Sequence, residues 1–176
     1  MESELIRRFV RDGDPRAFGQ LVELHQSAVR RFLRHLTRGN HAAADDLAQD
    51  TFLQAYRGGS RFRGDARFET WLLGIAYNHF RNWSRSRDAA PVAAANRPEA
   101  ATPATHRLSD LQRDLAEAMA NLSAEEQLAL NLVFQFGLTH AEIAATLHWP
   151  LGTVKTHLAR GKGRLGELLA LWKPRT

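Results

Sequence analysis

The fold is decided by the stretch GLTHAEIAATLHWPLGTVKTHLARGKGRL, residues 137–165. Thr139 and Glu142 have the spacing of a capping box, in which two side chains satisfy free backbone groups at a helix start. The short helix that follows must end before Pro150, because a proline keeps the residue before it out of the helical region. A second helix is predicted over residues 152–165. Two helices joined by a tight turn are typical of a helix-turn-helix.

The second helix of this motif lies in the most basic part of the chain, since residues 151–176 contain six Lys or Arg residues against one Glu. In a helix-turn-helix the second helix enters the major groove of DNA, and the residues at its start face the base edges. We therefore predict a surface that binds duplex DNA, with Lys162 and Arg164 contacting phosphates. Its residues are Thr139, Gly152, Thr153, Lys155, Thr156, His157, Arg160, Lys162 and Arg164. The alternative is an ordinary helical hairpin with a solvated basic face.

Two glycines, Gly161 and Gly163, lie inside this second helix. Each lowers helix propensity by roughly 1 kcal/mol relative to alanine. We therefore expect the end of the helix to fray.

The rest of the chain also has the pattern of helices. Apolar residues recur three or four positions apart almost everywhere, and no stretch shows sustained alternation of apolar and polar residues. Asp14 before Pro15 marks one helix start, and the capping-box spacings of Ser109 with Gln112 and of Ser123 with Glu126 mark two others. The helix after Ser123 is expected to run to the residue before Gly137, a residue type that suits the left-handed position after a helix. The predicted fold class is all-α.

One segment interrupts this pattern. Residues 88–107 hold eight alanines and three prolines but only one large aliphatic residue, Val92. Such a segment has little apolar surface to bury, and its prolines interrupt any helix, so it is predicted to be a flexible or extended tether. The predicted organisation is a first domain over residues 1–88, a linker over residues 89–108 and a second domain over residues 109–176.

The overall composition sets limits on function. The chain has 176 residues, a formal charge of +5 and a pI near 10.4, so a polyanion suits it as a partner. It has no cysteine, which excludes disulfides and thiolate chemistry and suits a reducing cytosol. The N-terminus lacks the features of a signal peptide, and no uncharged apolar run reaches the roughly 18 residues that cross a bilayer. We expect a cytoplasmic protein with no direct membrane insertion.

The sequence offers no catalytic pattern. It lacks the GxxxxGK[ST], HExxH and GxSxG motifs, which serve phosphate binding, metal-dependent hydrolysis and nucleophilic catalysis. Its eight histidines are scattered, and no two stand four residues apart as a metal pair on one helix face would. We expect no enzymatic activity, no cofactor and no metal site.

An acidic strip is predicted on the helix that contains DDLAQDTF, residues 45–52. Asp46 and Asp50 are one turn apart, and Asp45 and Gln49 lie on an adjacent strip of the same helix. Apolar surface beside them comes from Leu47, Ala48 and Phe52. An acidic face in a basic protein suits a basic protein partner better than DNA. The alternative is an ordinary solvated helix face.

Aromatic and arginine residues are concentrated just after this strip. Residues 52–83 hold eight of the fifteen aromatic residues, and residues 57–87 hold seven arginines against two acidic residues. Rings stack on unpaired bases and guanidinium groups pair with phosphates, so this composition predicts binding of single-stranded nucleic acid. Glycines 58, 59 and 64 predict a loop before a helix over residues 68–85. On that helix we expect Trp71, Leu72, Ile75 and Phe80 in the core, and Asn78, Asn82 and Arg85 in the binding surface.

Three stretches resemble, in order and spacing, parts of the extracytoplasmic-function (ECF) sigma factors of bacterial RNA polymerase. DDLAQDTF resembles region 2.2, FRGDARFETWLLGIAYNHFRNW (residues 62–83) resembles regions 2.3–2.4, and residues 137–165 resemble region 4. The resemblance covers nearly the whole chain outside the tether. It implies two small helical domains and the function of an alternative sigma factor.

The resemblance also implies a role for each group of residues. The acidic strip would dock on the clamp of core RNA polymerase through Asp45, Asp46, Leu47, Gln49, Asp50 and Phe52. The loop and the helix after it would open the minus-ten promoter element and hold its single strand through Arg61, Arg63, Asp65, Arg67, Trp71, Asn78, Asn82 and Arg85. The helix-turn-helix would read the duplex minus-thirty-five element while its domain contacts the polymerase flap. A cognate anti-sigma factor is expected as a further partner.

Some positions depart from the family pattern. Asn82 stands where aspartate is common, and His148 stands where the turn usually has glycine. Thr156 and His157 replace the commoner Ser-Arg pair. The upstream promoter sequence therefore cannot be copied from relatives.

A second resemblance offers an alternative function. The run TVKTHL, residues 153–158, is similar to the helix-turn-helix of transcription activators of the response-regulator type. Those proteins normally carry an α/β receiver or a ligand-sensing domain upstream, whereas the upstream part here is predicted to be helical. An activator would bind duplex DNA alone, and a sigma factor would bind core polymerase.

Overall fold

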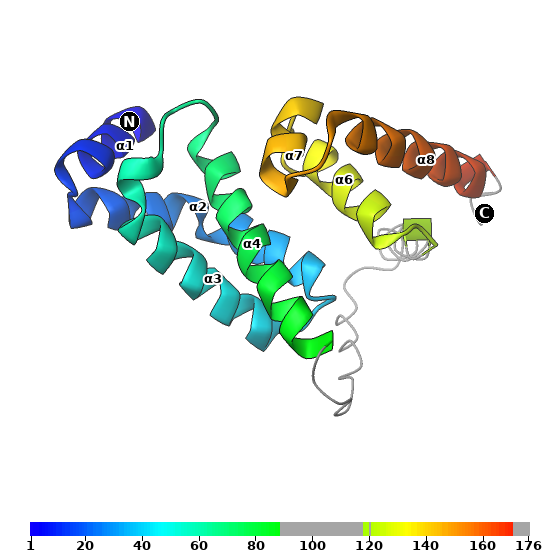
Figure 1. Cartoon of the computed structure of the whole chain (residues 1–176), viewed down its shortest axis with the longest axis horizontal. Coiled ribbons are helices and arrows are strands. Elements are labelled where there is room, and N and C mark those ends of the chain that lie inside the picture. The colour runs from blue at the N-terminus through cyan, green and yellow to red at the C-terminus, as the bar shows by residue number, and fades with distance from the viewer. Residues whose placement is uncertain (89–117, 120, 171–176) are drawn as a thin grey trace, which may run out of the picture. The chain divides into compact units, whose positions relative to one another are not determined.

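The structure is a computed structural model that describes residues 1–88, 118–119 and 121–170. The chain divides into two compact units, residues 1–99 and 100–176 (Figure 1). Every regular element within the described ranges is a helix, which confirms the all-α prediction. The predicted tether, residues 89–108, lies outside the described residues, so the domain boundaries drawn from it stay predictions.

The first unit is a bundle in which α2 packs against three neighbours, α1, α3 and α4. Its elements are α1 (Glu2–Asp12), α2 (Pro15–Leu36), α3 (His41–Arg57), the 3-10 turn η1 (Gly59–Arg61) and α4 (Phe68–Asp88). The fully buried side chains include Leu21, Val29 and Phe32 of α2 and Leu72 and Leu73 of α4. Helix α3 also packs against α4, so each long helix of the bundle buries one apolar face between its neighbours.

The start of α2 is fixed as predicted. The Asp14 carboxylate accepts hydrogen bonds from the backbone N–H groups of Arg16 (2.8 Å) and Ala17 (3.3 Å). Pro15 occupies the first helical position, where a missing N–H costs nothing. The turn between α1 and α2 is therefore set by residues that are neighbours in sequence.

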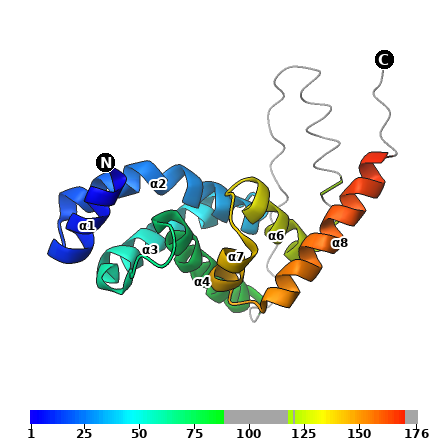
Figure 2. The same ribbon diagram turned by 90° about the horizontal axis from the view of Figure 1, so that it is seen from above.

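The second unit contains α6 (Ala124–Phe134), α7 (His140–Leu147) and α8 (Leu151–Ala170). Helix α8 packs against both α6 and α7. The core between them contains the fully buried side chains of Leu130, Leu132, Ile143, Leu147 and Val154. Figure 2 shows α8 as one continuous, straight helix.

The capping boxes predicted at Ser123 and Thr139 are present, while the one predicted at Ser109 lies outside the described residues. Ser123 N–H donates to the Glu126 carboxylate at 3.0 Å, and Thr139 N–H donates to that of Glu142 at 2.8 Å. Helix α6 ends at Phe134, two residues earlier than predicted, because Gly137 (φ 62°) and the residue after it turn back and donate to carbonyls of the last turn. The glycine itself adopts the predicted left-handed conformation.

Helix α8 does not end at its two glycines but continues to Ala170, and the fraying of its end stays a prediction. Gly161 is buried where α8 crosses α6, and a Cβ atom there would lie 2.9 Å from Leu130 Cδ1. Its lack of a side chain permits the close packing of the two helices, which offsets its low helix propensity. Within the described ranges, no helix combines the length and the hydrophobicity needed to cross a membrane.

Candidate functional site

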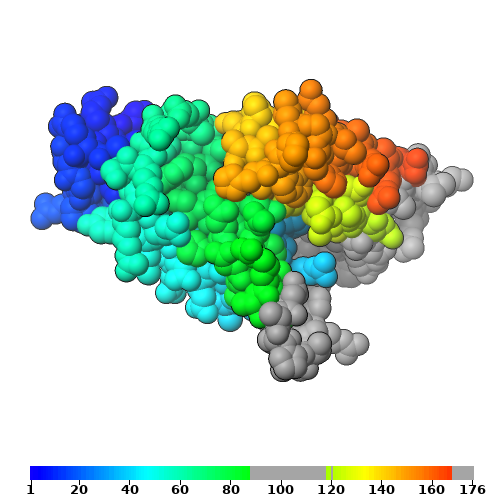
Figure 3. Space-filling model, viewed as in Figure 1, coloured from blue at the N-terminus to red at the C-terminus, as the bar shows by residue number. Residues whose placement is uncertain are grey.

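The predicted acidic strip lies on the outer side of α3. Asp46, Gln49 and Asp50 are exposed, and they are three or four residues apart, so they share one face of the helix. In the space-filling view of Figure 3, side chains of α3 reach the visible surface of the first unit. These three residues form the surface-accessible part of the strip.

Two other residues of the predicted strip are less accessible. Leu47 is only 5% exposed and belongs to the core, so it cannot present its side chain to a partner. Asp45 is half-buried, and its Oδ1 atom lies 3.5 Å from Arg30 Nε and 4.0 Å from Arg34 Nη2, both on α2. The charge of Asp45 is therefore balanced within the unit, where it joins α2 to α3.

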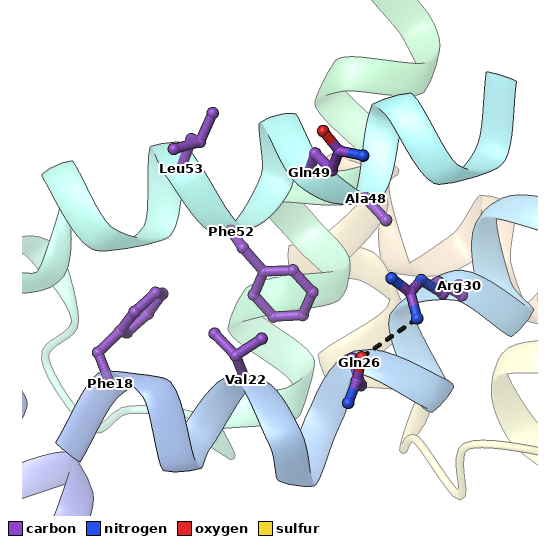
Figure 4. A pocket seen from close by; sticks show the side chains of 8 residues that line it. All are labelled: Phe18, Val22, Gln26, Arg30, Ala48, Gln49, Phe52 and Leu53. Carbon is purple, nitrogen blue, oxygen red and sulfur yellow. Dashed lines mark hydrogen bonds between the residues drawn. The ribbon is translucent and has the colours of Figure 1, made fainter. Parts of the chain in front are cut away.

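A groove of about 340 Å³ lies between α2 and α3, beside the strip (Figure 4). It is mostly apolar and is lined by Phe18, Val22, Gln26, Arg30, Ala48, Gln49, Phe52 and Leu53. The Phe52 ring projects from α3 toward Val22 of α2, and Arg30 lies toward one end, where it donates to the Gln26 side chain at 3.1 Å. Gln49 and Phe52 were expected at the site from sequence. The α2 wall was missed, although its residues recur every fourth position, which is the spacing of one helix face.

The loop between α3 and α4 carries four predicted DNA-binding residues, all exposed: Arg61, Arg63, Asp65 and Arg67. Phe62 is half-buried, and its ring centroid lies 5.2 Å from that of Phe68 and 5.3 Å from that of Trp71. Contacts between aromatic rings at these distances are favourable beyond the burial of area. The three rings anchor the loop to the start of α4 and leave its arginines facing solvent.

The other end of the loop is anchored by α1. Gly59 is buried beneath Phe9, and a Cβ atom at position 59 would lie 2.5 Å from Phe9 Cζ. The Phe9 ring also contacts the rings of Phe18 and Phe68, at centroid distances of 4.6 and 6.3 Å. The N-terminal helix therefore positions the loop, a role that no pattern in the sequence indicates.

The predicted polar face of α4 is present. Its three residues are exposed and lie three or four positions apart, so they share one face of the helix: Asn78, Asn82 and Arg85. The Arg85 guanidinium donates to the Asn82 side chain at 2.6 Å. Of the side chains expected in the core, Leu72 is fully buried, while Trp71, Ile75 and Phe80 are only half-buried. Arg87 lies 4.8 Å from the Trp83 ring centroid, an aromatic and arginine pair at the end of this helix that the sequence did not single out.

The helix-turn-helix places most of its predicted residues at the surface of the second unit. Those that are exposed are Thr139, Gly152, Lys155, Thr156, Arg160, Lys162 and Arg164, whereas Thr153 and His157 are half-buried. Val154 and Leu158, on the opposite side of α8, are buried. The first turns of α8 thus present polar and basic groups while their apolar side closes the core.

Arg164 has a structural contact in addition to its predicted phosphate contact, which stays a prediction. Its Nη1 atom lies 3.0 Å from Oε2 of Glu126, and the Glu126 side chain is only 4% exposed. The same oxygen accepts the Ser123 N–H of the capping box. Arg164 therefore neutralises a buried carboxylate through one guanidinium nitrogen and ties α8 to the start of α6, while its side chain stays more than half exposed.

Comparison with known families gives two matches along the chain. Residues 21–90 match the Sigma-70 region 2 family, and residues 112–165 match the Sigma-70, region 4 family. The first match contains α3, the loop and α4, and the second contains the helix-turn-helix.

Full-length proteins show the same relationship. The chain is similar to the RNA polymerase sigma-H factor of Pseudomonas aeruginosa, with 32% identity over 96% of this chain and 93% of that protein. It is 34% identical to the ECF RNA polymerase sigma factor SigM of Mycobacterium tuberculosis, over 96% of this chain and 84% of that protein. Among solved structures it is similar to the sigma factor RpoE, in complex with the anti-sigma factor NepR, from Bartonella quintana. That match has a TM-score of 0.69 at 30% identity and covers 89% of this chain and 98% of that one.

The described residues form helices, with an arginine-rich aromatic loop in the first unit and a helix-turn-helix in the second. These are features of a protein that binds nucleic acid. The two regions and the full-length relatives make the assignment specific. The chain belongs to the family of ECF RNA polymerase sigma factors and contains sigma-70 regions 2 and 4. This family is not enzymatic, in agreement with the prediction from sequence.

Proposed function

We propose that the protein binds core RNA polymerase, directs it to specific promoters, and opens the minus-ten element with binding energy alone. The observation that carries the proposal is that the two units present faces of opposite charge. An acidic face beside an apolar groove lies on the first unit, and a basic helix-turn-helix face lies on the second. One face suits a protein and the other suits DNA.

The polymerase site is the part of α3 that carries Asp46, Gln49 and Asp50, together with the groove beside it. Carboxylates at the edge of an apolar groove suit a partner helix with basic and apolar side chains. Phe52 would supply apolar contact from the groove, and Leu47 and Asp45 would support the surface from within. We propose the clamp of core polymerase as this partner, and the flap as a partner of the second unit.

The minus-ten site consists of the loop between α3 and α4 and the exposed face of α4. The arginines of the loop would neutralise phosphates, and the half-buried Trp71 would offer ring surface beside them. Asn78 and Asn82 carry amide groups that can both donate to and accept from the edges of unpaired bases. A loop anchored at both ends would hold these groups in place with little loss of entropy on binding.

The minus-thirty-five site is the first half of α8. Lys155 and Arg160 would contact base edges, and Lys162 would contact a phosphate. Arg164 would support this surface through its ion pair with Glu126. The alternative of a response-regulator activator does not fit, because the upstream unit matches sigma-70 region 2.

We also propose control by a cognate anti-sigma factor. The support is the similar sigma factor from Bartonella quintana, whose structure was solved with an anti-sigma factor bound. Since core polymerase acts on cytoplasmic DNA in bacteria, the same proposal places the chain in the cytoplasm.

The experiment that tests the polymerase site is charge reversal on α3. We expect the double variant Asp46→Arg, Asp50→Arg to lose binding to purified core polymerase, measured by pull-down and by titration. The matched control is Asp12→Arg, Glu23→Arg, which makes the same change in net charge at exposed positions of α1 and α2 outside the groove. Unchanged binding by the α3 variant, with its helical content intact, would show that the interface is assigned wrongly.

A second experiment separates the two DNA sites. Lys155→Ala with Arg160→Ala should weaken transcription from promoters that need the upstream element. Templates on which that element is dispensable should be transcribed as before. An equal loss on both kinds of template would contradict the proposed division of labour.

A further inference from the structure

The turn of the helix-turn-helix has an uncommon conformation for its sequence. His148 ends α7 in the left-handed region (φ 55°, ψ 38°), a conformation that is uncommon for residues other than glycine, although His, Asn and Asp adopt it more often than the rest. The next N–H, that of Trp149, donates to Ala144 O at 3.0 Å and closes the end of α7. Pro150 then leads into α8. The position of Trp149 is therefore fixed by its backbone on both sides.

This turn brings the Trp149 ring against a residue of α8. The centroid of the Trp149 ring lies 5.1 Å from that of the His157 imidazole, at an interplanar angle of 46°. Both side chains are half-buried, although His157 lies on the same face of α8 as Thr153 and the exposed Arg160. A histidine on an open helix face would sample several rotamers, and contact with a ring held by its own turn restricts that freedom.

The neighbouring Thr156 cannot offer its hydroxyl hydrogen as readily. Its Oγ1 donates to Gly152 O, one turn earlier in α8, at 2.9 Å. Of the pair Thr156–His157, the imidazole is therefore the side chain with a hydrogen to give to a base. A ring N–H can donate to the N7 or O6 acceptors that guanine presents in the major groove.

We infer that His157 is a specificity-determining residue of the upstream DNA site and that Trp149 is its positioning residue. Trp149 holds the imidazole at the base edges, so that one guanine of the upstream element is selected through a pair of side chains. This inference rests on the proposed function, because it requires the second unit to read duplex DNA.

The test measures which upstream sequences the protein selects. Holoenzyme reconstituted from the full chain and core polymerase is presented with a library of promoters randomised over the upstream element. For the wild-type protein we expect a guanine preference at one position. His157→Ala should lower that preference about five- to tenfold, as expected for the loss of one base contact.

The Trp149 variants distinguish positioning from a merely structural role. Trp149→Ala should lower the preference at the same position, and the double variant with His157→Ala should lose no more than His157→Ala alone. Trp149→Phe keeps a ring and should retain most of the preference. Thermal unfolding of each variant identifies any that fails to fold, and Trp149→Leu serves in place of the alanine variant if needed.

The outcomes separate the inference from the proposed function. If the wild-type protein selects a guanine and His157→Ala leaves it unchanged, the inference is wrong while the proposed function stands. The inference is also wrong, and the proposed function again stands, if the Trp149 variants weaken every position equally. If the wild-type holoenzyme forms but selects no upstream sequence, the proposed upstream site is wrong as well.

Discussion

The two units present helical faces of opposite charge on frameworks of different kinds. In the first unit, the exposed residues Asp46, Gln49 and Asp50 lie on α3 beside an apolar groove. In the second, Lys155, Arg160 and Lys162 are exposed on α8 above a closed core. The formal charge of +5 for the whole chain does not reveal these separate acidic and basic faces. The location of the charge, more than its sum, indicates which partner each unit suits.

The units also differ in what holds their functional surfaces. In the second, the first helix of the helix-turn-helix is fixed at its start by side chains three residues apart, Thr139 and Glu142 of the capping box. In the first, the loop that we propose to bind DNA depends on Phe9 covering Gly59, a contact between residues far apart in sequence. The loop should therefore be more sensitive to a change elsewhere in its unit, and the variants below test this difference.

The largest effect is expected from filling the space under Phe9. Gly59→Ala forces the ring or the loop to move, because the new Cβ would lie 2.5 Å from Phe9 Cζ. We expect a loss of about 1–3 kcal/mol in the free energy of unfolding, measured by denaturant titration. Gly19→Ala in α2 is the control, since nothing lies within 4 Å of a Cβ there. Equal stability of the two variants would refute the anchoring role of Phe9.

The next comparison sets Arg164 against Lys162 in α8. Arg164→Ala leaves the buried Glu126 carboxylate without its cation, so we expect a loss of roughly 1–3 kcal/mol in stability. Lys162→Ala should change the free energy of unfolding by less than about 0.5 kcal/mol. It should also lower the slope of log affinity for DNA against log salt concentration by about 1, the value for one phosphate contact. The measurements are thermal unfolding and affinity for upstream duplex at several salt concentrations. A reduced salt dependence of DNA binding in the Arg164 variant would show that Arg164 also contacts a phosphate.

A smaller effect separates the two glycines of α8. Gly163→Ala should stabilise the protein by up to about 1 kcal/mol, because alanine favours the helix and nothing lies within 4 Å of the new Cβ. Gly161→Ala places its Cβ 2.9 Å from Leu130 Cδ1, so this gain should be cancelled or reversed. The difference in melting temperature between the two variants measures how closely α6 and α8 are packed. A gain for both would mean that Leu130 moves aside at little cost.

The smallest effect concerns pH. Burial lowers the pKa of His35, at the end of α2, below its usual value. As the pH falls below the ordinary histidine pKa of about 6.5, the unfolded chain binds more protons than the folded one. The contribution of His35 to the free energy of unfolding is therefore fully present above that pH and decreases below it. His35→Gln should reduce the stability difference between pH 5.5 and 7.5. An unchanged difference in the His35 variant would contradict the assignment.

The same contrast explains what the sequence could and could not predict. Helix starts and the helix-turn-helix were predictable, because capping boxes and turns involve residues that are close in sequence. The ion pair of Arg164 with Glu126 joins residues 38 positions apart, and the groove needs two helices side by side. Each of these depends on packing that no local pattern encodes. For that reason Leu47 was assigned to a binding surface although it belongs to the core, and the contact of Arg164 with the buried Glu126 was not predicted.

In the proposed function this chain supplies promoter selection and core polymerase supplies the chemistry. The most direct measurement of that division is transcription in vitro from a library of promoter fragments, with purified core polymerase and the full chain. We predict discrete RNA start sites that require both components and that disappear with the Asp46→Arg, Asp50→Arg variant. Absence of any chain-dependent transcript, together with no affinity for core polymerase, would contradict the proposed function.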